Sequence, residues 1–383
     1  MKRKDLFLVF VTILFVVFAS CSKSDEVVPE EPEEPTAPGD STSIVLVSIA
    51  DDAFKAYLVK NFDTNSDGAI SVEEAMLVKK IECGELGIAS LEGIENFKNL
   101  TYLSCNKNQL TELDLSLNEA LTYLDCSENQ ITDLGLSENV NLEVLKCQKN
   151  ELSGLDCSIQ TELSYLNCSN NQLTVLGLSE NAVLDTVYCA GNKFSKLDLS
   201  ASTGLVYLEC AYSGISELNL GANTSLTYLS CGGNSLASFD VSMFSTLTHL
   251  YCSEIGCITL DLSKCTALTK LECSGNQNLT SLDVSACTAL TSLYCDRNAL
   301  TTLNVVGCSA LEYVNCSANQ LTSLSVKGCT ALTSLNCYSC GLGLSEMINM
   351  CLTLPEGNGG TVIYQDEIPS GLLDSKGWTW SRY

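Results

Sequence analysis

The chain has few of the side chains on which most catalytic and nucleic-acid-binding sites depend. Its 383 residues include one histidine, His249, and 20 basic against 46 acidic side chains. The formal charge of −26 excludes a nucleic-acid backbone as the ligand, because binding it requires a basic surface. A single histidine also leaves little material for a Ser-His relay or a histidine metal cage. We therefore expect a protein that is not an enzyme and does not bind nucleic acid.

The N-terminal residues predict export. A basic start at residues 2–4 precedes an apolar run over residues 6–19, which is too short to span a bilayer comfortably. Two small residues directly before Cys21 resemble the lipobox of bacterial lipoproteins, although Phe18 stands where leucine is usual. The resemblance implies a signal peptide over residues 1–20 and lipidation of Cys21. An ordinary secretory signal or an uncleaved anchor is the alternative.

A short acidic segment follows at residues 21–44. Four of the six prolines lie within residues 29–38, among glutamates. Such a stretch cannot bury a core, so we expect an extended linker that holds the folded part away from a membrane. Its acidic cluster is similar to the surface-export signal of Bacteroidetes lipoproteins. That similarity implies a lipid anchor on the outer face of the cell outer membrane as the chain's only membrane contact.

Residues 63–74 carry oxygen-bearing side chains at the spacing that a calcium ion needs. A hard dication binds six to eight oxygens, and a 12-residue loop can wrap them round one point only if it turns sharply, here at Gly68. The pattern resembles the EF-hand loop. The resemblance implies Ca²⁺ as cofactor, with the ligands Asp63, Asn65, Asp67, the carbonyl of Ala69, Ser71 and Glu74. An acidic turn without metal is the alternative.

The sequence around this loop predicts a small helical cap over residues 45–80. The entering helix begins near Asp51, and the exit helix is expected from Ala75 to Lys79. EF-hand loops usually pair through the residue at position 8, here Ile70, and the sequence contains no second loop. We therefore expect a structural cap on the neighbouring domain, with calcium affinity on the order of 10⁻⁴ M.

A 21-residue repeat fills the centre of the chain. It is typified by Leu100-Thr-Tyr-Leu-Ser-Cys-Asn-Lys-Asn-Gln-Leu and has one 22-residue unit. This pattern is that of the leucine-rich repeat, with cysteine in place of the third leucine, and it covers residues 78–351. Further units start at Leu121, Leu142, Leu163, Leu184, Leu205, Leu226, Leu247, Leu268, Leu290, Leu311 and Leu332.

Each repeat contains a nested half-repeat, as in Leu110-Thr-Glu-Leu-Asp-Leu-Ser. About ten residues per half leave no room for a helix. We expect a flat, mainly β solenoid of about 12 coils, each with two short parallel strands and neighbours about 4.8 Å apart. The chain resembles the short-repeat, internalin-like class of bacterial surface proteins.

Thirteen of the 22 cysteines occupy one column of the repeat, and a shorter column replaces asparagine from Cys265 onward. Their constant register favours buried free thiols, because side chains in a parallel ladder point the same way and converge poorly for a disulfide. A disulfide framework is the alternative. Cys337-Tyr-Ser-Cys340 matches C-x-x-C, but with no second pair and no nearby histidine it does not favour a zinc or redox site.

Tyrosines repeat at the outward positions of the first strand. The candidate ligand-binding residues are Tyr102, Tyr123, Tyr165, Tyr207, Tyr228 and Tyr313, with a second column at Tyr188, Tyr251 and Tyr294. Exposed tyrosines on a rigid sheet suit a protein or glycan partner, although tyrosine also suits strand surfaces generally. His249 is expected on the same surface. On the second strand, an acidic column is expected to be solvated, with cation bridging as the alternative: Asp114, Asp156, Asp198, Asp240, Asp261 and Asp283.

Residues 352–383 break the repeat and are expected to cap the last coil with Trp378 or Trp380. The sequence thus predicts a lipid-anchored, calcium-binding, monomeric surface module for binding or adhesion. A structural envelope protein without a discrete ligand is the alternative, and an enzyme is the least favoured one.

Overall fold

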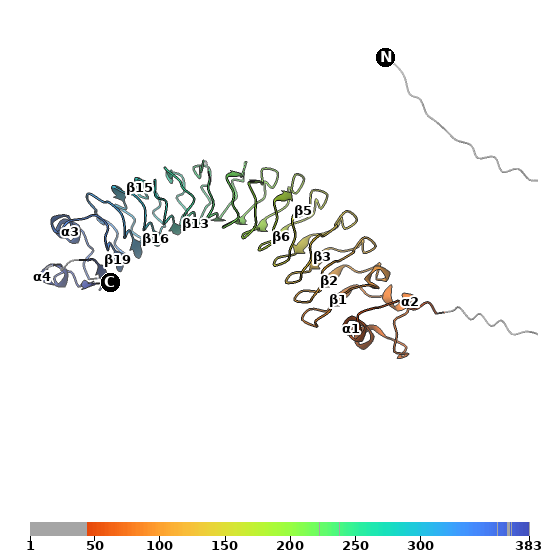
Figure 1. Ribbon diagram of the computed structural model, residues 1–383. Helices are drawn as coiled ribbons and strands as arrows, with labels where there is room; N and C mark the ends of the chain where they lie inside the picture. The colour runs from red at the N-terminus through yellow and green to blue at the C-terminus, as the bar shows by residue number, and fades with distance from the viewer. Residues whose placement is uncertain are drawn as a thin grey trace, which may run out of the picture. The chain divides into compact units, whose positions relative to one another are not determined.

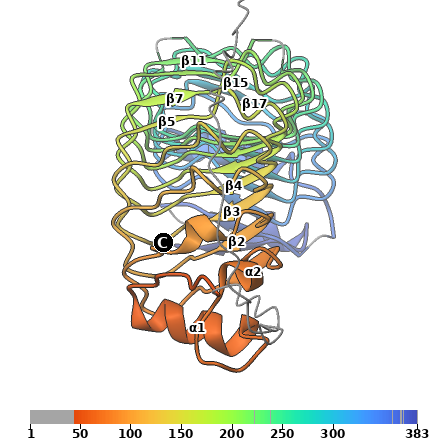
Figure 2. The ribbon, with the colours of Figure 1, turned by 90° about the vertical axis from the view of Figure 1, so that its right-hand side faces the viewer.

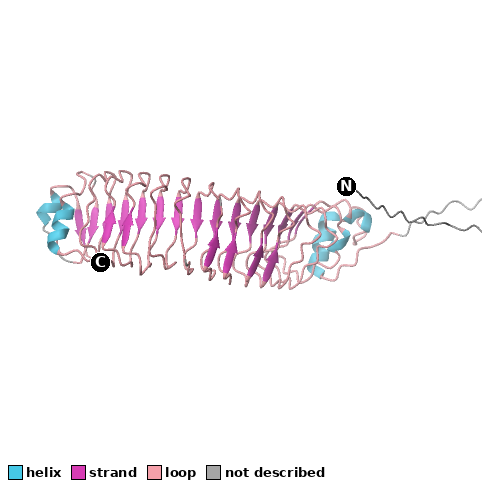
Figure 3. Ribbon diagram, turned by 90° about the horizontal axis from the view of Figure 1, so that it is seen from above, coloured by secondary structure: helices cyan, strands magenta, loops and turns pink. Residues whose placement is uncertain are grey.

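The computed structural model describes residues 44–221, 223–236, 238–357, 359–365, 368 and 370–382. The predicted signal peptide, the lipidation site Cys21 and the acidic segment up to residue 43 lie outside these residues. From residue 44 onward, successive coils stack into an arc-shaped solenoid with helices at both ends (Figures 1 and 3).

A long parallel sheet lines the inner side of the arc (Figure 1). Each strand has three residues, and the middle side chain points into the core while its two neighbours point outward. Within the described residues the sheet contains, in spatial order, β1 (Lys80–Glu82), β2 (Tyr102–Ser104), β3 (Tyr123–Asp125), β4 (Val144–Lys146), β6 (Tyr165–Asn167), β8 (Thr186–Tyr188), β10 (Tyr207–Glu209), β12 (Tyr228–Ser230), β13 (His249–Tyr251), β14 (Lys270–Glu272), β16 (Ser292–Tyr294), β18 (Tyr313–Asn315), β19 (Ser334–Asn336), β20 (Thr361–Ile363) and β21 (Thr379–Ser381).

The solenoid is longer than the repeat alone predicts. The regular units supply β2 to β19, but β1 precedes them and β20 and β21 follow them in the same sheet. The described chain therefore makes about 14 turns rather than the expected 12. The difference arises because an irregular first unit, which keeps Ile81 and Cys83 in register, adds β1, and the segment after residue 351, which lacks the repeat pattern, adds β20 and β21.

The prediction of a second strand in every coil was wrong. In the described residues only six such strands form, paired two by two on the outer side of the arc (Figure 1). Curvature explains the difference, because coils that are close enough for backbone pairing on the inner side are further apart on the outer side. These strands are β5 (Gly154–Asp156) with β7 (Val175–Gly177), β9 (Lys196–Asp198) with β11 (Glu217–Asn219), and β15 (Ser281–Asp283) with β17 (Thr302–Asn304).

Two helices cover the N-terminal end of the stack (Figure 2). α1 (Asp52–Phe62) begins where predicted, and the Asp51 carboxylate accepts the N–H groups of residues 53 and 54. The exit helix α2 (Val72–Ala75) starts earlier than the predicted Ala75–Lys79 segment. Ser71 and Glu74 form a capping box, which fixes the first turn at Val72. A short 3₁₀ helix, η1 (Ile94–Asn96), lies in the first coil.

The C-terminal end differs from the prediction, which ended the repeat at residue 351 and placed a cap after it. Residues 344–351 form α3 (Leu344–Cys351) instead of a last half-repeat, and α4 (Ser370–Asp374) lies between the two last strands. Trp378 is buried and its Nε1–H donates to the carbonyl of Pro355 at 2.8 Å, while Trp380 is half-buried. Trp378 therefore packs into the core at the C-terminal end, between the last two strands of the main sheet in the chain order.

The cysteine column forms the narrow side of the core. All thirteen members, from Cys83 to Cys337, are fully buried, and every cysteine of the described residues is a free thiol. Cysteine suits this place because its side chain is small and apolar enough to fit between stacked coils. The prediction of buried, unpaired thiols is confirmed.

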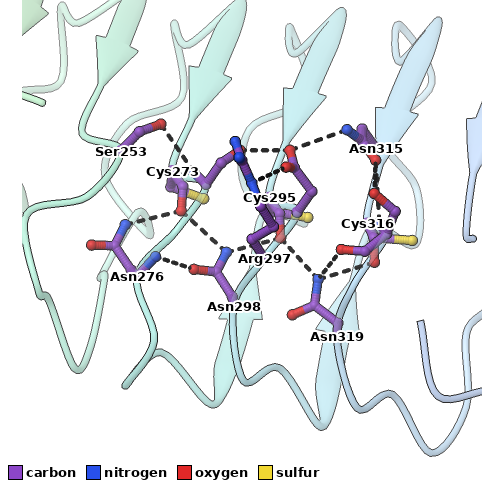
Figure 4. A network of polar contacts seen from close by, with 12 residues as sticks. Ser253, Cys273, Asn276, Cys295, Arg297, Asn298, Asn315, Cys316 and Asn319 are labelled. Atoms are coloured by element: carbon purple, nitrogen blue, oxygen red, sulfur yellow. Dashed lines mark hydrogen bonds and ion pairs between the residues drawn. The ribbon is translucent and has the colours of Figure 1, made fainter. Parts of the chain in front are cut away.

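Buried asparagines join neighbouring coils three residues after the column cysteines (Figure 4). Asn298 donates through Nδ2 to the carbonyl of Cys273 in the preceding coil at 3.1 Å and to that of Cys295 in its own coil at 2.8 Å. Its Oδ1 accepts the N–H of Asn276. Each such amide satisfies backbone groups that the turn leaves without strand partners. We call this set the asparagine ladder: Asn108, Asn129, Asn150, Asn171, Asn192, Asn234, Asn276, Asn298 and Asn319.

A second column of buried side chains also donates to backbone carbonyls, and it changes from amides to the thiols of the shorter cysteine column along the solenoid. In the first half of the solenoid, Asn139 donates to the carbonyls of Leu115 and Asn118, both at 3.1 Å. In the second half, the Cys329 thiol donates to the carbonyl of Val305 at 3.1 Å. The predicted inward orientation of this column is confirmed for Cys265, Cys287, Cys308 and Cys329. Cys351, in contrast, is buried within α3.

We expect Asn171→Ala to lower the free energy of unfolding by about 3 kcal/mol, because several buried backbone groups lose their partner. Asn171 donates to the carbonyls of Cys147 and Cys168 and accepts the N–H of Leu152 at 3.1 Å. The exposed Asn141→Ala is the control and should change stability by less than about 0.5 kcal/mol. Denaturant titration checks both values, and equal effects would contradict the role of the ladder.

The thiol columns predict a loss of stability in alkali. Burial raises the pKa of Cys126, Cys168 and Cys210 to about 12 each, whereas an unfolded thiol has a pKa of about 8.5. Stability is therefore complete below about pH 8.5 and falls as the pH rises from there toward 12. Denaturation midpoints at pH 7 and pH 10 measure this loss. At pH 8 a thiol reagent should modify these cysteines only after denaturant is added, and rapid modification of the native protein would refute their burial.

Candidate functional site

The tyrosines predicted as outward-facing all lie on the inner side of the arc. We define the concave face as the first and third residues of the strands of the main sheet. Tyr102, Tyr123, Tyr165, Tyr207, Tyr228 and Tyr313 occupy first positions, and Tyr188, Tyr251 and Tyr294 occupy third positions. They are half-buried, and the register places corresponding positions side by side in successive coils, as for Tyr102 and Tyr123.

The rings of the two tyrosine columns contact one another. Tyr102 and Tyr123 stack with centroids 4.1 Å apart and planes 5° apart, and Tyr207 and Tyr228 stack at 4.1 Å and 9°. Third-position rings bridge the coils where a first-position ring is missing, since Tyr188 lies 4.8 Å from Tyr207. Further ring pairs join Tyr165 to Tyr188, Tyr228 to Tyr251 and Tyr294 to Tyr313.

Three lysines complete this row, and the sequence reasoning missed them. The Lys80 ammonium lies 4.6 Å from the centroid of Tyr102. Lys146 lies 5.4 Å from Tyr123 and 5.7 Å from Tyr165. Lys270 fills the corresponding gap between Tyr251 and Tyr294. These lysines occupy the same alternating strand positions as the tyrosines, so the column register was the signal that could have revealed them.

The result is one continuous row across β1 to β18, which we call the aromatic band. Its members are Lys80, Tyr102, Tyr123, Lys146, Tyr165, Tyr188, Tyr207, Tyr228, His249, Tyr251, Lys270, Tyr294 and Tyr313. His249 faces outward as predicted, stacks on Tyr228 and has Nδ1 within 3.0 Å of the Thr248 hydroxyl.

Stacking determines which part of each ring a ligand meets. Where the planes are nearly parallel and 4.1 Å apart, neighbouring rings cover each other's faces, and the edges and hydroxyls remain toward solvent. Burial and hydrogen bonding with the Tyr123 hydroxyl raise the pKa of Tyr102 to about 12. The same causes, with the Tyr228 hydroxyl as partner, raise the pKa of Tyr207 further. Both phenols therefore stay neutral at physiological pH.

The concave face is nearly balanced in charge although the chain is strongly acidic. Within the described residues, its strand positions carry four acids, Glu82, Asp125, Glu209 and Glu272, and three bases, Lys80, Lys146 and Lys270. Two of the acids form ion pairs on their own strands. The excess negative charge therefore lies elsewhere on the molecule.

The acidic column on the outer side has a structural role that the sequence reasoning did not assign. Each carboxylate accepts the N–H of the serine two residues later, as Asp240 does from Ser242 at 2.8 Å. This bond stabilises the turn that leads back toward the core. Hydrogen bonding to the neighbouring serine lowers the pKa of all six carboxyls: Asp114, Asp156, Asp198, Asp240, Asp261 and Asp283.

The loop over residues 63–74 turns tightly on itself. Asp63 accepts the N–H groups of Ser66 at 2.6 Å and of Gly68 at 2.9 Å. The Asn65 side chain accepts the N–H of Asp67, and the Asp67 carboxylate accepts the N–H of Ala69. Ser66 and Gly68 have φ values of 63° and 82°, in the left-handed region that glycine adopts without strain. The first three predicted ligands therefore lie within one exposed turn.

The last predicted ligand, Glu74, is buried and hydrogen-bonded. One carboxylate oxygen accepts from the Thr64 N–H and hydroxyl, both at 2.7 Å, and the other accepts from the Ser71 N–H and hydroxyl, both at 2.9 Å. These bonds lower the pKa of Glu74 to about 2. No group of three or more His, Cys, Asp or Glu side chains in the described part of the chain is already arranged round a metal position.

The position-8 residue of the loop finds a partner in the chain just before α1. The carbonyl of Ile70 accepts the N–H of Val47 at 2.8 Å, and Val72 donates to the carbonyl of Val45 at 2.8 Å. Leu46 thereby forms an antiparallel bridge with Ser71. The segment 45–47 thus pairs with the end of the loop through a short antiparallel bridge.

The cap is also joined to the first coil. Asp51 accepts the N–H groups of Ala89 at 2.8 Å and Ser90 at 3.3 Å. The Tyr57 hydroxyl accepts the N–H of Glu82 in β1, at the end of the main sheet, at 2.9 Å. The expected packing of the loop unit on the solenoid is therefore present.

The C-x-x-C pair lies within the core. Cys337 is the last member of the cysteine column, with its sulfur 3.9 Å from that of Met347, and Cys340 stands at an asparagine-ladder position. Both are buried. Among the described residues, no helix is long and apolar enough to cross a membrane.

Comparison with known proteins finds internalins among the relatives of this chain. No family model matches the chain. The functional domain of InlJ from Listeria monocytogenes, described as including a cysteine ladder, is 30% identical, with coverage of 83% of this chain and 81% of that domain and a TM-score of 0.59. InlF from the same species superposes with a TM-score of 0.64 at 23% identity, covering 89% of this chain and 98% of that one. Internalin J of Listeria monocytogenes is 35% identical over 68 residues, which are 18% of this chain but only 7% of that protein.

Proposed function

Because the chain belongs to the internalin-like leucine-rich-repeat family, we propose that it is a binding or adhesion module that recognises its ligand through the concave face. The aromatic band carries this proposal. It offers large, partly polar side chains on a rigid sheet, a composition that recurs in the energetically dominant parts of protein interfaces.

The arrangement of the rings favours a protein over a glycan as the ligand. Sugar rings generally stack on exposed aromatic faces, but in pairs such as Tyr207 and Tyr228 the neighbouring ring occupies the face. Ring edges and neutral hydroxyls remain, and these contact protein surfaces well. A glycan ligand is the second candidate and is tested in the same experiment.

The site of action rests on the N-terminal sequence. The basic start, short apolar run and Cys21 support a lipid anchor, and the acidic segment behind it supports display on the outer face of the outer membrane. The predicted linker, residues 21–44, would separate this anchor from the solenoid. The concave face would then be available to a partner outside the cell.

Calcium would act at the cap and not at the concave face. Asp63, Asn65, Asp67, the Ala69 carbonyl, Ser71 and Glu74 supply the oxygens that Ca²⁺ prefers. Glu74 would exchange its bonds from Thr64 for the ion. The ion would stiffen a loop that is paired with residues 45–47, at the point where the chain enters the solenoid.

We expect the triple variant Tyr102→Ala, Tyr207→Ala and Tyr228→Ala to reduce ligand attachment about ten-fold or more, because it breaks both closely stacked ring pairs of the aromatic band. Binding is measured on arrays of extracellular proteins and of glycans, and thermal unfolding monitors the fold. Signal on proteins alone supports the favoured ligand class.

The matched control replaces outward residues at the same strand position on the outer side, with Val175→Ala, Lys196→Ala and Thr302→Ala. Its attachment should equal that of the unmodified protein. If the tyrosine variant is destabilised but attaches normally, the rings serve the solenoid alone and the structural alternative is correct.

Calorimetric titration should detect one calcium site with a dissociation constant on the order of 10⁻⁴ M. Asp63→Ala combined with Glu74→Gln removes two charged ligands and should abolish binding. Asp52→Asn, which removes one negative charge at the start of α1 and outside the loop, should leave it unchanged. Absence of saturable binding to the unmodified protein would show that the loop is an acidic turn without metal.

A further inference from the structure

The aromatic band contains two places where the chain binds its own ammonium groups. Lys146 lies between the rings of Tyr123 and Tyr165, and Lys270 lies between those of Tyr251 and Tyr294, at centroid distances of 5.0–5.7 Å. In each case the rings come from the strands on either side of the lysine strand. The spacing of this sheet therefore suits a cation held among tyrosines.

Glutamates accompany two of the lysines of the band in a repeated pattern. On β1 the Lys80 ammonium lies 2.9 Å from the Glu82 carboxylate, and on β14 Lys270 lies 2.9 Å from Glu272. In both pairs the lysine holds the first strand position and the glutamate the third. The carboxylate thus has its cation on its own strand.

Glu209 on β10 is the exception to this pattern. Its strand begins with Tyr207 where β1 and β14 begin with lysine, so no cation of its own strand is next to it. The neighbouring strands β6, β8, β12 and β13 carry no lysine or arginine at outward positions. Among the described residues, Glu209 forms no ion pair, and it is half-buried beside Tyr188 in the sheet register.

We propose that Glu209, with the rings of Tyr188, Tyr207 and Tyr228, forms a subsite for a lysine or arginine side chain of the partner protein. This proposal rests on the proposed binding function of the concave face. On β14 the Glu272 carboxylate has its cation in Lys270 at the first strand position, whereas β10 has Tyr207 there, stacked on Tyr228. A cation for Glu209 therefore has to come from outside the chain, and it meets the edges of these rings rather than their faces. The net charge of −26 favours the approach of a basic partner, and the balanced charge of the rest of the concave face directs its cation to this position.

Pentalysine serves as the probe, and its fully acetylated form tests whether the charge is needed. The purified protein should bind pentalysine saturably in calorimetry. Glu209→Gln keeps the shape of the side chain, so the fold should be retained, and we expect about five-fold weaker binding because the ionic partner is lost. Acetylated pentalysine should not bind.

Two matched variants decide between a subsite and general attraction to an acidic protein. Glu272→Gln makes the same change of charge on the same sheet, where Lys270 already occupies the position, and should weaken binding less than about two-fold. Lys270→Met leaves Glu272 unpaired between Tyr251 and Tyr294 and should add a second pentalysine site. Equal losses from Glu209→Gln and Glu272→Gln, or no additional site in Lys270→Met, would overturn the subsite. Either result leaves the tyrosine experiment on arrays free to confirm or refute the binding function itself.

Discussion

The hydrogen bond from a buried asparagine to the carbonyl of the preceding coil is the constraint on which the solenoid depends. A coil of about 21 residues contains corners where the backbone has no strand partner, and these corners are buried. Asn298 and its counterparts satisfy groups of two consecutive coils at once. An amide can do this only if the coils have nearly the same length, so the bond fixes the period of the repeat. The 22-residue unit keeps the same bonds through Asn276, at the same sequence separations as in the 21-residue units.

Coils of equal length produce different strand pairing on the inner and outer sides of the arc. On the inner side the strands pair without interruption from β1 to β21, so outward side chains stand at the spacing of a sheet and their rings touch. On the outer side the strands pair only in twos. There the acidic side chains, such as Asp240, bond to the serine of their own turn, and Asp198 and Asp283 also accept an amide from the next coil. The same period therefore builds a continuous surface on one side and a series of separate acidic turns on the other.

The sequence predicts the parts of this structure that depend on periodicity. Cys105 and Tyr102 lie where the register places them, since burial alternates with period two along their strand. What could not be predicted depends on tertiary geometry. The curvature that prevents most second strands, the helix at residues 344–351 and the pairing of residues 45–47 with Ile70 have no repeated signal. Lys146 and Lys270 were missed for a different reason, because attention to one residue type in a column hides other types that occupy the same place.

Departures from the repeat are where a solenoid of this kind becomes specific. A uniform ladder of tyrosines would present the same surface at every coil and could not fix the position of a ligand along the arc. Lys146 on β4 and Lys270 on β14 fill the gaps among the rings, so an external cation cannot bind at those two places. Only β10 combines an unpaired carboxylate with rings on both neighbouring strands in the described chain. A single Lys-to-Tyr difference between otherwise equivalent strands thus gives a repetitive surface one distinct position.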